Sequence, residues 1–395
     1  MNIMKNSPTY QNYALTYLLI LISGSSLYNA NKEMILLSVF PCLVALMLVS
    51  KKRISIVFFF YCLLMLAILL ALFFYTQGSL PLPSIIGTMM SLFIAYAILS
   101  IVREHFLESF VRVVMVIAVI SLIGYSIDSL GFRPVMLSIL PGEAWKFIYH
   151  FDYHIHLERN NAIFYEPGAY QVYLNAAIFV LAFSNVSIPR KTKLIFFAVL
   201  VVTLLTTGST TGYLMFAFLL LVMLLKSPLL TGKLKVGVLV FGAIMMASSP
   251  LLLNEIILKK LESYTSIKDI TDSDNRRSLD VLVDIEVFKS YPFGAGYDEY
   301  SKNFAQVGQL KEGTGSSNGF TRTFAIYGFP FTLFFFGTLF FFFYKFFHDR
   351  VVIFSGFFLL MVFLYSQSNF VFSHIILALI AAIFVYDAPH REKKL

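Results

Sequence analysis

Long, nearly uncharged apolar stretches recur along this 395-residue chain, and they constrain its fold more than any other feature. A helix that crosses a bilayer needs roughly 20 mostly apolar residues, and about twelve such stretches can be drawn here. Only 13% of the residues are charged, whereas soluble domains carry about 25%. We therefore expect an all-α polytopic membrane protein in which residues 1–395 form a single integral membrane domain.

The expected spans are separated by short connections and by two large polar loops, residues 131–168 and 254–319. The spans are residues 12–28, 34–50, 54–75, 82–102, 110–130, 169–184, 194–206, 213–225, 234–253, 320–347, 351–365 and 370–386. The spans at 194–206 and 213–225 are short and are joined by TTGSTTG. That turn either lines a cavity within the membrane depth or is a plain hairpin whose small residues favour helix packing.

Lysine and arginine are concentrated in every second connection, as the positive-inside rule requires of cytoplasmic loops. The basic connections are residues 51–53, 103–109, 189–193, 226–235 and 345–350, together with the C-terminal tail. The connections at 29–33, 76–81 and 366–369 have little net charge. This alternation predicts cytoplasmic N- and C-termini and both large loops outside. The N-terminus is polar before its first apolar run and shows no small-residue cleavage pattern after it, so we expect that run to be retained as a span.

The basic residues form no contiguous patch, so nucleic acid is excluded as an expected partner. Cys42 and Cys62 lie inside apolar runs, which is typical of buried small residues and predicts no disulfide framework.

The first large loop contains Arg159, Glu166 and the pair His154 and His156. Alternating residues predict that the two histidines share one face of an extended segment, but no third ligand stands at a fixed spacing, so we expect no metal. Glu166 precedes a proline that opens the next span. It either stabilises the start of that helix or acts as a general base at the membrane surface.

The second large loop contains Arg276 and Arg277 at the start of a predicted helix, where positive side chains oppose the helix dipole. Such a basic pair favours an anionic ligand, because the planar guanidinium holds phosphate oxygens in pairs. The alternative is a salt bridge to Asp272 or Asp280. Asp280 and Asp284 are four residues apart and therefore share one helix face.

Arg322 lies near the outer end of the span at 320–347. An arginine there either extends to the lipid headgroups or belongs to a functional site.

Four motifs follow one another in this order along the chain. They are RNNAIFYEPG at 159–168, the Ser/Thr/Gly turn at 207–212, NRR at 275–277 followed by YPFGAG at 291–296, and SNGF at 317–320 before Tyr327-Gly328. Their order and shared outer placement resemble those of Wzy-type O-antigen and capsular polysaccharide polymerases and, more distantly, O-antigen ligases.

The resemblance implies a GT-C-like membrane glycosyltransferase of the bacterial inner membrane that needs no cofactor or metal. Its donor would be a growing glycan on undecaprenyl diphosphate and its acceptor a new repeat unit on the same lipid. The reaction would take place on the periplasmic face, with a Wzz-type chain-length regulator as a partner. Glu166 is the expected base, with His156 or Asp280 as alternatives. The residues expected to hold the diphosphate are Arg159, Arg276, Arg277 and Arg322, and further substrate contacts are expected from His154, Asn318 and Tyr165.

Two other functions fit parts of this pattern. In ligases a histidine commonly stands at the position of Ser317, which therefore favours a polymerase. A flippase of lipid-linked oligosaccharides predicts charged residues inside the spans, where this chain has few. A purely structural protein would leave the outer arginines unexplained.

Overall fold

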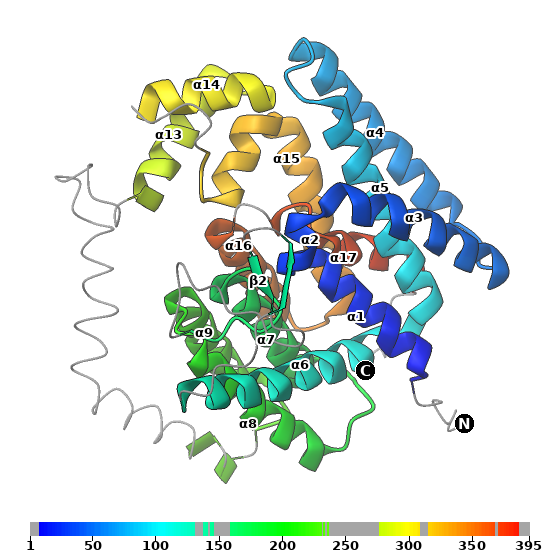
Figure 1. The fold of residues 1–395 in the computed structure, drawn as a ribbon, viewed down its shortest axis with the longest axis vertical. Helices are drawn as coiled ribbons and strands as arrows, with labels where there is room; N and C mark the ends of the chain where they lie inside the picture. The colour runs from blue at the N-terminus through cyan, green and yellow to red at the C-terminus, as the bar shows by residue number, and fades with distance from the viewer. Residues whose placement is uncertain are drawn as a thin grey trace.

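The computed structural model describes residues 8–130, 137–140, 143–145, 159–230, 232–233, 235–236, 276–308, 315–367 and 370–386. Nearly all of these residues are helical (Figure 1). The exception is a short antiparallel hairpin in the first large loop, formed by β1 (Leu137–Leu140) and β2 (Glu143–Trp145). His154 and His156, Asp272 and the side chains of Arg276 and Arg277 lie outside the described residues.

The helices follow the predicted spans closely. The first seven helical elements are α1 (Tyr10–Gly24), α2 (Ser26–Ala30), α3 (Lys32–Val49), α4 (Ile56–Tyr75), α5 (Leu82–Val102), the 3-10 turn η1 (Arg103–His105) and α6 (Phe106–Ser129). The others with given bounds are α7 (Pro167–Phe183), α8 (Arg190–Thr206), α9 (Thr210–Lys226), α13 (Arg276–Ser290), α14 (Gly296–Gly308), α15 (Gly319–Phe346), α16 (Arg350–Ser366) and α17 (His374–Val385). Each predicted span other than 234–253, most of which lies outside the described residues, falls on helical segments; the span 12–28 is divided between α1 and α2.

Four helical stretches in the described part of the chain are long and apolar enough to cross a membrane. They are Lys32–Val49, Ile56–Tyr75, Leu82–Ile127 and Gly319–Phe346. Helices α7, α9, α16 and α17 are apolar but shorter. The expectation of an all-α membrane protein is thus supported, while the count of twelve crossings and the GT-C-like fold stay predictions.

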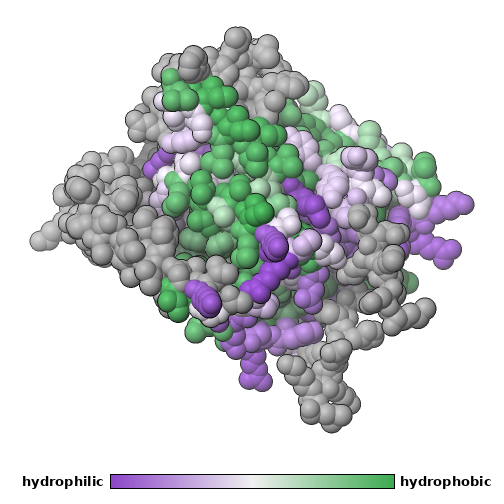
Figure 2. Space-filling view, turned by 90° about the horizontal axis from the view of Figure 1, so that it is seen from below, coloured by the Kyte–Doolittle hydropathy of each residue, from purple (hydrophilic) through white to green (hydrophobic). Residues whose placement is uncertain are grey.

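Large apolar side chains point outward from the peripheral helices α3 and α4. Leu37 on α3 is 69% exposed and Phe60 on α4 is 61% exposed. Figure 2 shows a broad hydrophobic area on one face of the molecule, with hydrophilic residues gathered beside it. Soluble monomers rarely expose such extended apolar surface, whereas a protein in a bilayer covers it with lipid. In contrast, α5 and α17 lie inside the bundle, where Leu92 and Leu377 are fully buried.

Helix α15 is broken at Gly328, although the sequence predicts one continuous span over 320–347. Gly328 has φ +74° and ψ 174°, and any side chain there would overlap the backbone of Phe293. Pro330, two residues later, cannot donate to the helix ladder. The turn before α14 fills this break: the Phe329 N–H donates to the Pro292 carbonyl at 2.9 Å. The motif YPFGAG is therefore the segment that docks α13 and α14 on α15 (Figure 1).

Candidate functional site

A cavity of about 410 Å³ lies where the ends of several helices meet, ends that the sequence predicts to be on the outer side. It is lined from α1 to α3, from the end of the first large loop, from α14 and α15, and from the segment before α17. Lining residues with polar side chains include Lys32, Tyr165, Tyr297, Arg322, Tyr327 and Ser373. Lys32 and Arg322 are the charged residues of this lining, and it contains no carboxylate among the described residues.

Arg322 is held in the cavity by aromatic rings. Its guanidinium carbon lies 5.8 Å from the ring centre of Tyr300 and 6.0 Å from that of Tyr297. These are cation–π distances, which stabilise a fixed position of the cation. The Tyr297 hydroxyl is fixed in turn by the Tyr327 hydroxyl at 2.9 Å. The buried Nε of Arg322 has no hydrogen-bond partner among the described residues, so this side chain keeps donor capacity for a ligand.

Behind Arg322, two fully buried carboxylates join α13 to the start of α15. Asp280 accepts hydrogen bonds from the backbone N–H and the hydroxyl of Ser317 at 2.7 and 2.6 Å. Asp284 accepts from the hydroxyls of Tyr300 at 2.8 Å and Thr321 at 2.5 Å. The prediction that these aspartates share one helix face is confirmed. Because Asp280 does not line the cavity, its contacts give it a positioning role at the start of α15.

Burial raises the pKa of Asp284 to about 6. The hydrogen bonds from Thr321 and Tyr300 oppose this shift, and the neighbouring Asp280 adds to it. The cost of removing a charged carboxylate from water therefore outweighs its hydrogen bonds. The Asp284 carboxyl titrates within two pH units of neutrality while it holds α13 and α15 together.

Asn318 caps α15. Its side-chain oxygen accepts from the backbone N–H groups of Phe320 at 2.9 Å and Thr321 at 3.2 Å. An asparagine at this position satisfies helix N–H groups that would otherwise lack a partner. A substrate contact from Asn318 stays a prediction, and the structure adds this capping role one residue before the cavity-lining Gly319.

The start of the RNN motif packs against the turn between α8 and α9. The Asn160 side chain donates to the hydroxyls of Thr206 at 2.9 Å and Ser121 at 3.2 Å. Arg159 covers Gly208, where a β-carbon would come within 3.0 Å of the Arg159 Nε. Gly208 also has φ +57°, which favours glycine. The turn is thus packed by protein, as the hairpin interpretation expects, and Arg159 does not line the cavity.

The end of the same motif reaches the cavity. The Tyr165 hydroxyl donates to the Gln367 side-chain oxygen at 2.8 Å, which joins the first large loop to the end of α16. Burial raises the Tyr165 pKa well above its usual value, and the Glu166 charge adds to this effect. Glu166 is half-buried at the N-cap of α7, where its side chain makes no capping hydrogen bond. Its carboxylate therefore lies beside a cavity-lining residue without serving the helix start as a cap.

The structure brings together some of the predicted residues and separates others. Tyr165 from the first large loop and Arg322 from α15 line one cavity. Glu166 and Asn318 are sequence neighbours of the lining residues Tyr165 and Gly319. Arg159 lies instead against the turn at Gly208. The positions of His154 and His156 and of the side chains of Arg276 and Arg277 lie outside the described residues.

Lys32 and Ser373 are lining residues that the sequence analysis did not single out. Lys32 stands next to Glu33, so a count of net charge over residues 29–33 hides it. A lysine in a connection that is predicted to lie outside departs from the positive-inside rule. That departure is the feature of the sequence that could have indicated Lys32. Ser373 carries no signal in sequence, since it precedes an ordinary apolar helix.

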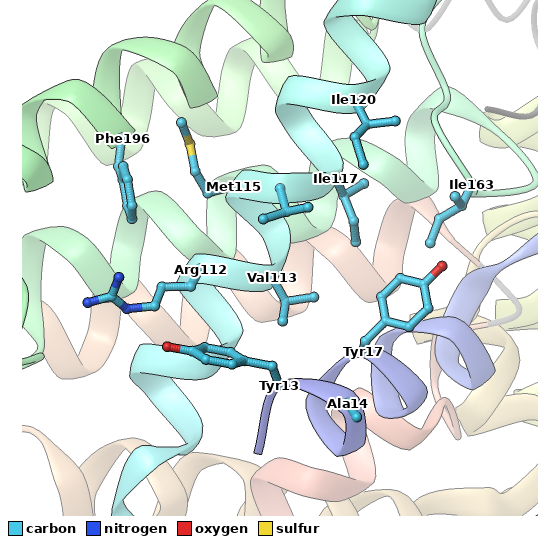
Figure 3. Close-up of a pocket in the computed structure, with 11 residues that line it drawn as sticks. Tyr13, Ala14, Tyr17, Arg112, Val113, Met115, Ile117, Ile120, Ile163 and Phe196 are labelled. Atoms are coloured by element: carbon cyan, nitrogen blue, oxygen red, sulfur yellow. The ribbon is translucent and has the colours of Figure 1, made fainter. Parts of the chain in front are cut away.

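A second, larger cavity of about 910 Å³ lies between α1, α6 and α8. Its lining is almost entirely apolar, and Figure 3 shows Arg112 at one side and Ile163 at the other. Arg112 is paired with Glu108 at 2.8 Å. Ile163 stands two residues before Tyr165, so the first-loop segment borders both cavities.

Comparisons of the chain with protein-family models, with curated proteins and with solved structures gave no match. Among the residues that the structure describes, no three histidine, cysteine, aspartate or glutamate side chains are grouped as metal ligands would be.

Proposed function

We propose that this protein is a polysaccharide polymerase of the bacterial inner membrane, a membrane glycosyltransferase with a GT-C-like fold. It transfers a growing glycan from undecaprenyl diphosphate to a new repeat unit on the same lipid, on the periplasmic face. The observation that carries this proposal is the cavity that joins the first loop, through Tyr165, to α15, through Arg322. The order of the motifs, which resembles that of the Wzy-type polymerases, supports it independently.

The proposed reaction breaks the bond between the donor's terminal sugar and its phosphate oxygen. The bonding electrons leave with the diphosphate, whose developing negative charge Arg322 is placed to stabilise. The acceptor hydroxyl attacks the sugar carbon and loses its proton to Glu166, the carboxylate next to Tyr165. The products are a glycan longer by one block and free polyprenyl diphosphate. Arg276 and Arg277, at the start of α13, remain proposed contacts of the diphosphate.

Part of the site has a positioning role in this proposal. Asp280 and Asp284 hold the N-terminal turn of α15, and Arg322 is in that turn. Arg159 fixes the first loop on the turn between α8 and α9. A Wzz-type regulator is the proposed partner for control of chain length.

The test is complementation of a strain that lacks its own polymerase but makes the matching repeat unit. Wild-type protein is expected to restore a ladder of polymer on gels. Arg322→Ala and Glu166→Gln, at matched membrane levels, are expected to leave single-repeat material, with losses of about 100-fold or more. Lys302→Ala, which removes an exposed charge from α14, is the control and keeps the ladder.

Two results would contradict the proposal. One is a full ladder from Arg322→Ala. The other is no ladder from the wild type, with lipid-linked units accumulating on the cytoplasmic side in its absence, which is the behaviour of a transporter.

A further inference from the structure

Three helices begin at the cavity of about 410 Å³. Lys32 is the first residue of α3, Gly319 is the first residue of α15, and Ser373 directly precedes α17. All three residues line the cavity. The start of a helix carries about half a positive charge and unpaired N–H groups, and it attracts anions. Three such ends around one cavity add to the charges of Lys32 and Arg322.

Two of the three helix starts lack a side-chain cap. Asn318 caps α15, but neither the side chain of Asn31 before α3 nor that of Ser373 before α17 accepts a hydrogen bond from its own helix. Asparagine and serine are the residue types that usually do so. The first N–H groups of α3 and α17 therefore keep their capacity to bind an anion.

Ser373 gives a second, independent indication of a ligand. Only 6% of the residue is exposed, and it lines the cavity. Its hydroxyl has no hydrogen-bond partner among the described residues. A buried hydroxyl without a partner costs free energy unless a ligand or water completes its hydrogen bonds.

We infer that the cavity contains two phosphate subsites, and that Lys32, Ser373 and the starts of α3 and α17 form the second of them. The first subsite is formed by Arg322 and the start of α15. The ligand class is a diphosphate ester, each of whose phosphates is bound in one subsite. The inference rests on the proposed function for the identity of the ester as a polyprenyl diphosphate carrier. Beyond the proposed function, it assigns ligand contacts to two segments outside both large loops, the start of α3 and the start of α17. It also predicts that the cavity binds a diphosphate more tightly than a monophosphate.

The experiment measures binding to the purified full-length protein in detergent by isothermal titration calorimetry. The probes are inorganic pyrophosphate, geranyl diphosphate and geranyl phosphate. The variants are Lys32→Ala, Lys32→Arg and Ser373→Ala, with Lys302→Ala as a control that removes the same charge from exposed α14. Lys32 is exposed at the rim of the cavity, so its replacement leaves the core unchanged.

The wild type is expected to bind both diphosphate probes more tightly than geranyl phosphate. Lys32→Ala is expected to weaken diphosphate binding about tenfold or more, because a charge-assisted contact is lost, and to weaken geranyl phosphate binding less than threefold. Ser373→Ala should act in the same direction with a smaller effect. Lys32→Arg is expected to restore most of the affinity, and Lys302→Ala to have none of these effects.

Three results would overturn the inference: diphosphate affinity unchanged in Lys32→Ala, equal losses for diphosphate and monophosphate, or no diphosphate binding by the wild type. Equal losses would identify a monophosphate headgroup as the ligand. The assay does not depend on polymer formation. If the diphosphate binds as expected and no ladder forms in the complementation test, the subsites stand and the proposed reaction fails.

Discussion

Arg322 shows how an arginine can be fixed without a carboxylate in direct contact among the residues that the structure describes. Two tyrosine rings hold its guanidinium, and the two aspartates of α13 hold the backbone on which it stands. A direct salt bridge would neutralise the arginine and compete with an anionic ligand. Asp280 and Asp284 do not line the cavity, so the positive charge of Arg322 stays available to an anionic ligand.

Asp284 predicts a pH dependence of stability. Its pKa is about 3.8 when unfolded and about 6 when folded, so the folded protein binds more protons between these values. The stabilising effect of protonation is complete below pH 3.8 and is lost as the pH rises through about 6. A shift of about two units corresponds to roughly 3 kcal/mol.

We therefore expect the thermal unfolding temperature of the wild type to decrease as the pH is raised from 4.5 to 7.5. The unfolding temperature of the Asp284→Asn variant should depend less on pH over the same range. Intrinsic fluorescence of the detergent-purified protein measures both. Asp298→Asn, at an exposed position of α14, is the control and should keep the wild-type profile. Equal slopes for the wild type and Asp284→Asn would refute the assignment.

Two substitutions of Asn318 can distinguish its role as a helix cap from a role in ligand binding. Asn318→Ala removes the cap of α15 and is expected to lower stability by about 1 kcal/mol, whereas Asn318→Ser keeps an accepting oxygen without adding a charge and should retain most of the stability. If the buried side-chain nitrogen also contacts substrate, Asn318→Ser will lose polymerase activity while it stays nearly as stable as the wild type. Thermal unfolding and the ladder assay, run on the same two variants, distinguish the roles.

At the scale of elements, the break in α15 determines how the second large loop meets the membrane helices. The motif YPFGAG docks into it through the Phe329–Pro292 and Ala295–Ala325 backbone hydrogen bonds. The sequence contained both residues that make the break, Gly328 and Pro330. Hydropathy could not reveal it, because it averages over a window and the flanking phenylalanines are apolar on both sides of the break.

Gly328→Ala is expected to be strongly destabilising, by about 3 kcal/mol or more. Its backbone conformation favours glycine, and the added carbon would overlap the Phe293 backbone, which cannot move without undocking α14. Gly337→Ala is the matched control in the same helix, where an added carbon meets nothing within 4 Å. Yield and unfolding midpoint after purification measure both variants, and similar behaviour of the two would contradict this account of the break.

The helices could be predicted because the apolar runs are separated by charged or turn-forming segments. The contacts between distant segments could not be predicted. Tyr165 reaches Gln367, and Lys32 reaches the same cavity as Arg322, across large separations in sequence. No local pattern encodes such meetings. From the sequence, Arg159 and Arg322 are both expected to hold the diphosphate. In the structure Arg159 does not line the cavity that Arg322 lines, because Asn160 anchors the start of the motif to Thr206.

For the whole molecule, segments predicted to lie on the same side of the membrane contact one another. Lys226 pairs with Asp349 at 2.9 Å, and the Tyr386 hydroxyl donates to the Arg103 carbonyl at 2.8 Å. All four belong to predicted cytoplasmic ends or the residues next to them. The cavity of about 410 Å³ gathers predicted outer ends. These two groupings support the alternation deduced from lysine and arginine.

Cysteine labelling tests this orientation. In a Cys42→Ser, Cys62→Ser background, Lys302→Cys on α14 should react with a membrane-impermeant maleimide in intact spheroplasts. Arg350→Cys at the start of α16 should react only after the membrane is permeabilised. Both positions are exposed, so access to the reagent depends on the side of the membrane. The reverse pattern would invert the topology and place the cavity on the cytoplasmic face.

In the function that we propose, the cavity around Arg322 carries out glycan transfer from a lipid diphosphate. The most direct measurement uses the purified protein in liposomes with lipid-diphosphate-linked repeat units as the only substrate. We expect longer glycans and one equivalent of free polyprenyl diphosphate for each linkage formed, with both products lost in Arg322→Ala and kept in Lys302→Ala. Unchanged glycan length with wild-type protein, or equal turnover by Arg322→Ala, would contradict it.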